Sequence, residues 1–313
     1  RRHGVTLVTR RVLLVPHPRR PDIGEIVRDV ATRLAAQGVA TAMIAADAAA
    51  LPSTDIGPST VVTDVSAARD CELVCVLGGD GTILRGAELA RGTDTPLLGI
   101  NLGKVGFLAE VEMADLATTV DRIVARDYTV EERMTLDVTV SHGAGVDTST
   151  WALNEVSIEK AARERMLEVT VEIDGRPLST WGCDGVIVAT PTGSTAYAFS
   201  AGGPVVWPDV EAILLVPNSA HALFARPVVV GPRSRLAVEV IRDAEGQGVL
   251  WCDGRRHVDL APGARIDVCR SAVPMRLARL SHAPFTDRLV EKFDLSVAGW
   301  RGNGAGRPQP ATG

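Results

Sequence analysis

Residues 78–82, Gly-Gly-Asp-Gly-Thr, combine the features of a phosphate-binding loop with a carboxylate at its centre. An apolar run over residues 71–77 leads into the loop, and a helical pattern follows over residues 83–90. A glycine loop between a buried strand and a helix binds anions, because free N–H groups and the helix dipole face the ligand. Asp80 would repel a phosphate unless it held a metal ion or accepted a proton. The loop therefore predicts phosphoryl transfer to a hydroxyl group.

The loop alone leaves a second interpretation open, because a glycine turn with a solvated aspartate has the same residue types. No GxxxxGK[ST] motif occurs in the chain, which excludes a Walker P-loop. The spacing of the three glycines also differs from the GxGxxG fingerprint of dinucleotide-dependent dehydrogenases. The chemistry of the loop therefore depends on what surrounds it.

Two polar segments further along the chain can complete such a site. Residues 101–108 (NLGKVGFL) follow a strand pattern, and glycines on either side of Lys104 predict a second loop at the carboxyl edge of the sheet. Asn154 and Glu155 stand in the run WALNEVSIE, where an amide beside a carboxylate suits a carboxamide or a ribose hydroxyl. An ordinary interdomain connection and a solvated polar pair are the respective alternatives.

Residues 184–200 (DGVIVATPTGSTAYAFS) form a third polar segment, rich in small and hydroxyl side chains. Small residues let a ligand approach the backbone, hydroxyls bind ribose or phosphate, and Tyr197 can stack on a base or bond to it. The alternative is a loop with a helix N-cap at Thr192 or Ser194.

The elements that must position these segments alternate between strand and helix over residues 12–112. Such alternation predicts a Rossmann-like α/β domain, in which helices cover a parallel sheet. Strand patterns cover residues 12–15, 39–45, 71–77 and 96–100, and helical patterns cover residues 23–34 and 83–90.

From about residue 130, apolar and polar residues alternate with period two, which predicts a second, β-rich and sandwich-like domain. Asp253-Gly254 indicates a hairpin turn within it and nothing more. A helical pattern over residues 285–293 predicts a carboxy-terminal helix that returns to the first domain. The predicted α/β domain comprises residues 1–112 and 283–300, the β-rich domain residues 113–282, and a disordered tail residues 301–313.

Composition narrows the class of protein. With 313 residues, 46% of them hydrophobic and 23% charged, the chain can build large cores. Its net charge of −5 argues against a protein that binds nucleic acid or an anionic membrane. No apolar stretch approaches the roughly 20 residues of a membrane helix, and no export signal is evident, so a cytoplasmic protein is expected. The five cysteines lack a CxxC spacing and are expected to be buried free thiols.

The four motifs together resemble the NAD kinase family, in the family's order and over roughly residues 12–300. GGDGT alone is shared with diacylglycerol, sphingosine and 6-phosphofructokinases. NLGxxGFL, the Asn-Glu pair and DG…TPTGSTAY make the match specific, and ALNEVSIEK together with the GWR near the end resembles actinobacterial members.

The resemblance implies a phosphotransferase with an alcohol group as acceptor. ATP or inorganic polyphosphate would phosphorylate the 2′-hydroxyl of the adenosine ribose of NAD to give NADP, with Mg²⁺ or another divalent cation. The implied assembly is a homodimer or homotetramer with the site between domains. The motifs do not decide the donor, NAD against NADH, the oligomer size, feedback by NADP or the metal ligands.

Residue by residue, the resemblance makes Asp80 the catalytic base and lets the loop glycines bring backbone amides to phosphate. His221 and Arg226 are expected to be structural or subunit-interface residues. Arg85 and Arg165 are assigned to the dinucleotide phosphates, although solvated arginines fit the pattern nearly as well and Arg163 is placed as well as Arg165. The predicted binding residues are Gly79, Gly81, Arg85, Asn154, Glu155, Arg165, Asp184, Thr195, Ala196, Tyr197 and Ser200.

Two other functions fit the sequence less well. A lipid kinase of the GGDG superfamily needs a large apolar pocket or a basic membrane-facing patch, against which the acidic balance and the hydroxyl-rich segment argue. A dinucleotide-binding module without catalysis needs no base, against which Asp80 argues.

Overall fold

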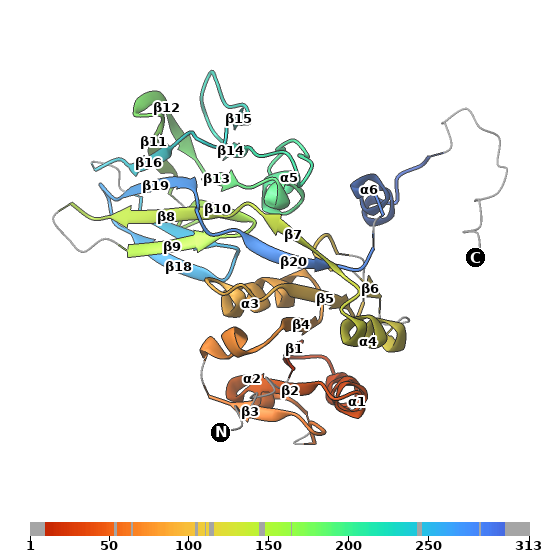
Figure 1. Ribbon diagram of the computed structural model, residues 1–313. Helices are drawn as coiled ribbons and strands as arrows, with labels where there is room; N and C mark the ends of the chain where they lie inside the picture. The colour runs from red at the N-terminus through yellow and green to blue at the C-terminus, as the bar shows by residue number, and fades with distance from the viewer. Residues whose placement is uncertain are drawn as a thin grey trace, which may run out of the picture.

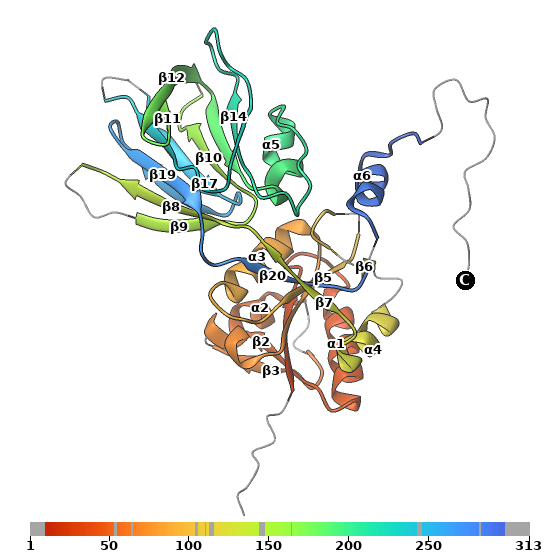
Figure 2. The same ribbon diagram turned by 45° about the horizontal axis from the view of Figure 1, so that its top comes forward.

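The computed structural model describes residues 10–52, 55–63, 65–103, 106–109, 111–112, 116–143, 148–163, 165–242, 246–281 and 283–297. Two domains follow one another along the chain, an α/β domain and a β-rich domain, and β20 runs back from the second into the first (Figures 1 and 2). The predicted tail, residues 301–313, and Lys104 of the second loop lie outside the described residues.

The first domain is built on a sheet with the strand order β3-β2-β1-β4-β5-β20-β7, and β6 also pairs with β5. The sheet is parallel except where β7 joins β20. Its apolar strands are buried on both faces, as parallel sheets require. The strands are β1 (Arg11–Pro16), β2 (Ala40–Ile44), β3 (Thr60–Val62), β4 (Leu73–Leu77), β5 (Leu97–Asn101), β6 (Val111–Glu112), β7 (Thr129–Arg133) and β20 (Met275–Arg279).

Helices cover both faces of this sheet. The apolar faces of α1 (Ile23–Ala36) and α4 (Leu116–Ala125) pack on one side, and α3 (Asp80–Ala90) with the 3₁₀ segment η1 (Val65–Asp70) packs on the other. A short helix, α2 (Ala45–Ala50), follows β2. The predicted Rossmann-like α/β domain is confirmed.

The second domain is a sandwich of two antiparallel sheets, as predicted. Their inner faces share one core in which Trp181 is fully buried. One sheet has the order β15-β14-β13-β10-β17-β18, with strands β10 (Glu155–Lys160), β13 (Gly185–Ala189), β14 (Ile213–Asn218), β15 (Val228–Val230), β17 (Gly248–Cys252) and β18 (Arg256–Leu260). The other has the order β12-β11-β16-β19-β8-β9, with strands β8 (Leu136–Ser141), β9 (Thr148–Ala152), β11 (Leu167–Ile173), β12 (Arg176–Cys183), β16 (Leu236–Val240) and β19 (Arg265–Arg270).

The sheets of the structure place the border between the two domains differently from the predicted border at residue 113. Strands β7 and β20 pair with each other and belong to the first sheet, although the sequence division places both in the β-rich domain. The reason is that a period-two pattern shows a strand and its buried face but not the sheet that it joins. The β-rich domain is therefore inserted between two strands of the α/β domain.

The final helix, α6 (Phe285–Phe293), coincides with the predicted helical pattern and contacts both domains. None of its nine side chains, all of them described, is buried. The ring of Phe293 packs in tilted contacts against Phe107 of the first domain and Phe199 of the second, with ring centroids 5.6 and 4.7 Å apart. Arg288 donates to the carbonyls of Phe107 and Ala109. Aromatic contacts and these two hydrogen bonds thus hold a helix that has no buried face.

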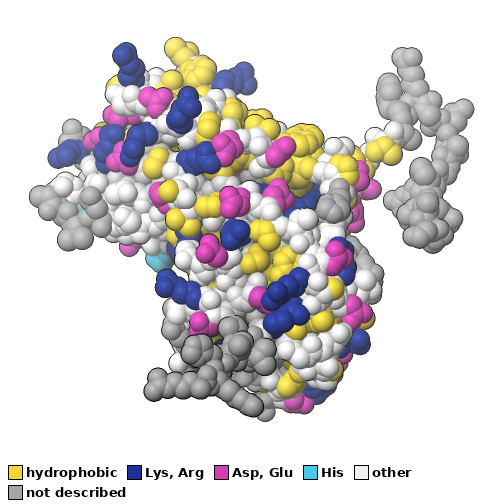
Figure 3. Space-filling view, in the orientation of Figure 1, with side chains coloured by type: hydrophobic (Ala, Val, Ile, Leu, Met, Phe, Trp, Pro, Cys, Tyr) yellow, Lys and Arg dark blue, Asp and Glu magenta, His cyan; other side chains and the backbone are white. Residues whose placement is uncertain are grey.

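The surface shows hydrophobic side chains at the tip of the β-rich domain (Figure 3). Leu223 and Phe224, in the connection between β14 and β15, and Val229 of β15 are exposed. All five cysteines lie in the described part of the chain and are free, and four of them are buried, as expected. Among the helices of the described ranges, none is long and apolar enough to cross a bilayer.

Candidate active site

Asp80 is the first residue of α3, directly after the buried strand β4 and two glycines. Its carboxylate turns toward the second glycine loop, where Oδ2 accepts the N–H of Phe107 at 3.0 Å and Oδ1 accepts the N–H of Leu108 at 3.1 Å. The two loops predicted at the carboxyl edge of the sheet are therefore joined through the carboxylate itself. Each oxygen keeps a lone pair for another partner.

The glycines of these loops have different tasks. A Cβ at Gly106 would lie 2.3 Å from Asp80 Oδ1, and one at Gly78 would lie 2.5 Å from Thr82 Oγ1. These two positions require glycine because neighbouring side chains pack against their backbone. At Gly79 and Gly81 no described atom lies within 4 Å of an added Cβ. These two glycines leave open space instead, and both line the cavity beside Asp80.

That cavity has a volume of about 360 Å³ and a basic wall. Both domains contribute, because Arg255 lies in the turn between β17 and β18. Helix α3 directs its amino-terminal end into the same space, which adds to the attraction for anions. The lining residues are His17, Pro18, Arg19, Gly79, Asp80, Gly81, Thr82, Arg85 and Arg255.

Asn154 and Glu155 are buried at the start of β10, where the strand begins in the face that the two domains share. Leu153, the residue before them, packs into the core of the first domain beside α3. Asn154 Oδ1 and Glu155 Oε2 are buried and have no hydrogen-bond partner among the described residues. Because buried polar atoms are almost always bonded, this pair indicates a place for a polar ligand.

The hydroxyl-rich segment packs against the same strand. Residues Thr192–Thr195 form a 3₁₀ turn and Tyr197–Ser200 form α5, on the outer face of β13 and β14. A Cβ at Gly193 would lie 2.0 Å from the carbonyl oxygen of Asn154, so only glycine lets the two segments approach this closely. The Tyr197 N–H donates to the Glu155 carboxyl.

The other predicted residues of this segment line its solvent side. Thr195, Ala196 and Tyr197 are half-buried and Ser200 is exposed. The Tyr197 hydroxyl accepts a hydrogen bond from Asn218 at 3.3 Å. Asp184, in the turn between β12 and β13, forms an ion pair with Lys160 at 2.5 Å. The structure thus brings the Asn-Glu pair and the TGSTAY run together, with Asp184 engaged beside them.

The predicted arginines differ in their surroundings. Arg85 lines the cavity at Asp80 and forms an ion pair with the buried Asp47 of α2. Nothing in the AADAAA sequence of α2 indicates that Asp47 pairs with an arginine. Arg163 and Arg165 are both exposed at the turn after β10, so the structure does not favour one over the other. The contacts of these arginines to dinucleotide phosphates stay predictions.

Asp253 was predicted to be part of a hairpin turn only, and that prediction was incomplete. The turn exists, with left-handed φ angles of 55° at Asp253 and 61° at Gly254. The Asp253 carboxylate is buried, however, and accepts the backbone N–H groups of residues 153–155. His17, Arg19 and Arg255 were also missed at the cavity. None of them belongs to a motif, and only tertiary contacts reveal their positions.

Glu155 and Asp253 are buried carboxyls that lie beside each other, and the pKa of each is raised. Burial raises the pKa of Glu155 to about 8, and the negative charge of Asp253 adds to the shift. Burial also raises the pKa of Asp253, but three backbone N–H groups and Arg256 oppose that rise. The Glu155 carboxyl therefore holds a proton at neutral pH.

Glu155 is expected to make the free energy of unfolding fall as the pH rises from 4.5 to 8. Over that range the folded protein holds a proton on Glu155 that the unfolded chain releases, so a rising pH favours unfolding. Glu155→Gln should remove this part of the pH dependence. Urea unfolding at pH 6 and pH 9 measures it, with Glu168→Gln, an exposed carboxylate on β11, as the control. If the free energy of unfolding changed equally between pH 6 and pH 9 in the wild type and in Glu155→Gln, the raised pKa of Glu155 would be contradicted.

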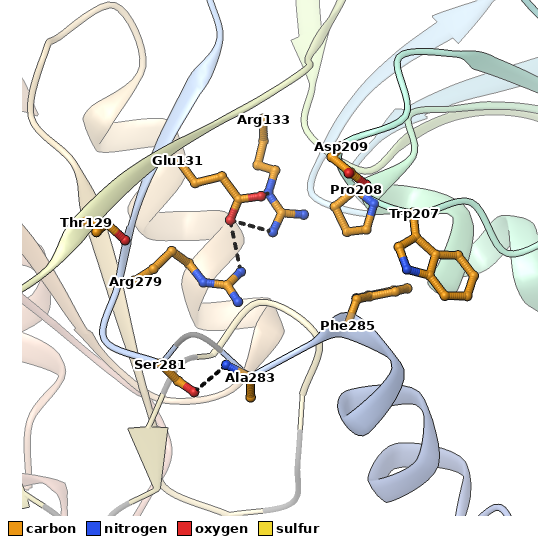
Figure 4. A pocket seen from close by; sticks show the side chains of 10 residues that line it. All are labelled: Thr129, Glu131, Arg133, Trp207, Pro208, Asp209, Arg279, Ser281, Ala283 and Phe285. Carbon is orange, nitrogen blue, oxygen red and sulfur yellow. Dashed lines mark hydrogen bonds and ion pairs between the residues drawn. The ribbon is translucent and has the colours of Figure 1, made fainter.

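A second cavity, of about 390 Å³, lies between β7, β20 and α6 (Figure 4). Glu131 forms ion pairs with both Arg133 and Arg279, at 3.0 and 3.2 Å. Trp207 and Phe285 form the facing wall, with ring centroids 5.4 Å apart. The cavity contains none of the predicted site residues, and its arginines are engaged by Glu131. The cavity lies where the two domains meet.

A metal site made by the protein alone is absent from the described ranges, where no cluster of three or more His, Cys, Asp or Glu side chains is placed to hold an ion. Mg²⁺ commonly uses one or two carboxylates together with substrate phosphates. Asp80 at the wall of a basic cavity fits that arrangement.

The comparisons with known proteins agree with this geometry. Residues 12–128 match the sequence model of the ATP-NAD kinase N-terminal domain, and residues 153–280 match that of the ATP-NAD kinase C-terminal domain. The chain belongs to the ATP-NAD kinase family. The predicted family, the phosphotransferase class and the conversion of NAD to NADP are confirmed.

The kinase is similar to curated relatives over nearly its whole length. It is 57% identical to NAD kinase 2 of Streptomyces avermitilis over 293 residues, covering 94% of this chain and 97% of the relative. It is also 57% identical to the NAD kinase of Thermobifida fusca, covering 95% and 93%. The predicted resemblance to actinobacterial members is thereby confirmed.

Solved structures share the fold of the kinase. Yeast NADH kinase complexed with NADH superposes with a TM-score of 0.82 at 23% identity, covering 94% of this chain and 90% of that one. An NAD kinase from Archaeoglobus fulgidus in complex with ATP superposes with a TM-score of 0.70 at 26% identity, covering 91% and 100%.

Proposed function

We propose that this kinase transfers the terminal phosphate of ATP, or of inorganic polyphosphate, to the 2′-hydroxyl of the adenosine ribose of NAD. The observation that carries the proposal is the position of Asp80, whose carboxylate stands at the wall of a basic cavity to which both domains contribute. A carboxylate among cations is placed to take a proton next to a bound phosphate chain.

The donor's phosphates occupy the cavity beside Asp80. Open space at Gly79 and Gly81 lets the phosphates approach the backbone of the α3 amino terminus. Arg19 and Arg255 supply positive charge from two sides of this space. The Archaeoglobus relative solved with ATP supports a nucleotide donor.

The acceptor is held by the second domain. Asn154 Oδ1 and Glu155 Oε2 are the buried atoms that await polar partners, and NAD offers ribose hydroxyls and a carboxamide. Arg85, Arg165, Asp184, Thr195, Ala196, Tyr197 and Ser200 would surround the rest of the dinucleotide. The yeast relative solved with NADH supports a dinucleotide acceptor of this kind.

In the reaction the 2′-oxygen forms a bond to the terminal phosphorus and the bond to the leaving phosphate breaks. Asp80 takes the hydroxyl proton, or polarises that bond, which is worth on the order of 10²–10⁴-fold in rate. The backbone N–H groups of Phe107 and Leu108 fix the carboxylate for this task. A bound Mg²⁺ would neutralise charge on the donor phosphates.

A coupled assay of NADP formation tests the proposal, with ATP, polyphosphate or no donor in parallel, each with and without Mg²⁺. NADP is expected with ATP and Mg²⁺, and none without a donor. NADH in place of NAD tests the acceptor, and a panel of lipids tests the lipid-kinase alternative. Tight NAD binding without NADP from any donor would contradict the proposal and favour a dinucleotide-binding module.

A homodimer or homotetramer, implied by the family resemblance, stays a proposal. The exposed Leu223, Phe224 and Val229, in and beside the connection between β14 and β15, support it, because apolar side chains gathered on a surface favour association. His221 lies at the start of the same connection and bridges to Gly182 of β12.

A further inference from the structure

We propose that residues 253–256, the turn between β17 and β18, form a bracket that positions Asn154 and Glu155 and ties them to α3. Asp253 is its positioning residue. The inference rests on the proposed role of Asn154 and Glu155 in holding NAD. A turn that serves only to reverse the chain needs no buried charge, and this one has a carboxylate whose side chain is 2% exposed.

The first arm of the bracket holds the backbone of residues 153–155. Asp253 Oδ1 accepts the N–H groups of Leu153 at 3.0 Å, Asn154 at 2.7 Å and Glu155 at 3.3 Å. The backbone N–H of Asp253 donates to the Glu155 carbonyl at 2.9 Å. A carboxylate that collects several N–H groups makes strong, charge-assisted hydrogen bonds.

The opposite side of the same segment is held as well. The hydroxyl of Thr190 donates to the Leu153 carbonyl at 2.6 Å, and its backbone N–H donates to the Asn154 carbonyl at 2.9 Å. The N–H groups of residues 153–155 are thus bonded to the Asp253 carboxylate, and the carbonyls of Leu153 and Asn154 are bonded to Thr190. With the backbone bonded from both sides, Asn154 Oδ1 and Glu155 Oε2 remain available to a ligand.

The second arm reaches the helix that begins at Asp80. Arg255 makes two hydrogen bonds to Glu88 of α3, at 3.0 and 3.2 Å, and Arg256 lies 3.3 Å from the same carboxylate. Arg256 also pairs with Asp253 at 2.8 Å. One turn therefore joins the backbone of the acceptor residues to the helix that carries the proposed base.

Asp253→Asn is the direct test, because asparagine tolerates the left-handed backbone and keeps one acceptor oxygen while placing an NH₂ toward the N–H groups. We expect the KM for NAD to rise by about 10-fold to 100-fold, since a shift of about 1 Å in a binding group can cost on the order of 10²-fold. The KM for ATP should stay near the wild-type value.

Asp174→Asn is the matched control. Asp174 also precedes a glycine in a hairpin turn, has a φ of 53°, and accepts the N–H of Arg235 at 2.9 Å. It is remote from the proposed site, between β11 and β12, and its variant should keep both KM values. Equal changes in the two variants would overturn the proposal.

Two further variants keep the proposal falsifiable if Asp253→Asn does not fold. Glu88→Gln and Glu88→Ala remove the partly exposed ion pairs to Arg255 and Arg256, so that folding should persist, and both leave the arginine at the cavity in place. Each is expected to lower kcat several-fold. Unchanged kcat in both variants would overturn the link to α3.

Asn154→Ala separates failure of the bracket from failure of the proposed function. If it leaves the KM for NAD unchanged, the acceptor role of Asn154 is wrong, and the bracket proposal falls with it. If it raises the KM for NAD and Asp253→Asn does not, the acceptor role stands and the bracket alone is overturned.

Discussion

The Asp80→Asn enzyme is expected to lose kcat for NADP formation by on the order of 10²–10⁴-fold while its affinity for NAD stays close to that of the wild type. Asparagine keeps the size of the side chain and removes its basicity. In this structure it also places an NH₂ group toward one of the N–H groups of Phe107 and Leu108. Loss of one such hydrogen bond should lower the free energy of unfolding by about 1 kcal/mol.

Steady-state kinetics, calorimetry of NAD binding and urea unfolding together separate these effects. Glu25→Gln is the control, because Glu25 is an exposed acidic residue in the first turn of α1, outside the cavity at Asp80. Near-normal turnover of Asp80→Asn with intact NAD binding would show that Asp80 is not the base.

Gly106→Ala is expected to lower kcat by about 10²-fold, although it removes no catalytic group. The new Cβ would lie 2.3 Å from Asp80 Oδ1, so either the carboxylate or the loop must move. Movement of the loop also weakens the hydrogen bonds from Phe107 and Leu108. The variant thus displaces the carboxylate without changing its basicity.

Gly103→Ala, in the same loop, is the matched control because no described atom lies within 4 Å of an added Cβ there. Both variants are assayed for kcat and for thermal unfolding. If Gly106→Ala turned over as fast as Gly103→Ala, the position of Asp80 against this loop would be irrelevant to the reaction.

Much of the fold follows from local patterns in the sequence. Alternation of strand and helix predicts the parallel sheet, and the period-two runs Leu136/Val138/Val140 and Val169/Val171/Ile173 coincide with β8 and β11. The inward residues of both strands lie in the sandwich core. These features were predictable because burial of one face imposes a period on the sequence.

The parts that could not be predicted depend on partners far away in the chain. Nothing in MRLAR shows that β20 lies between β5 and β7, since Leu277 meets Leu97 only in the folded sheet. Asp253 has the sequence context of many Asp-Gly turns, and its role depends on burial against residues 153–155. The motif residues were found by resemblance, and their supporting partners were not.

The place of β20 in the first sheet has a consequence for how the chain matures on the ribosome. When the nascent chain has emerged only through β7, that strand lacks β20, its one partner in the described part of the chain. Strand β5 pairs with β6 at Ile100 and Asn101, but its edge at Leu97 is still open. Open edges favour pairing with other chains. The whole β-rich domain must be synthesised before β20 can complete the sheet of the α/β domain. The α/β domain is therefore the first to be started and the last to be completed.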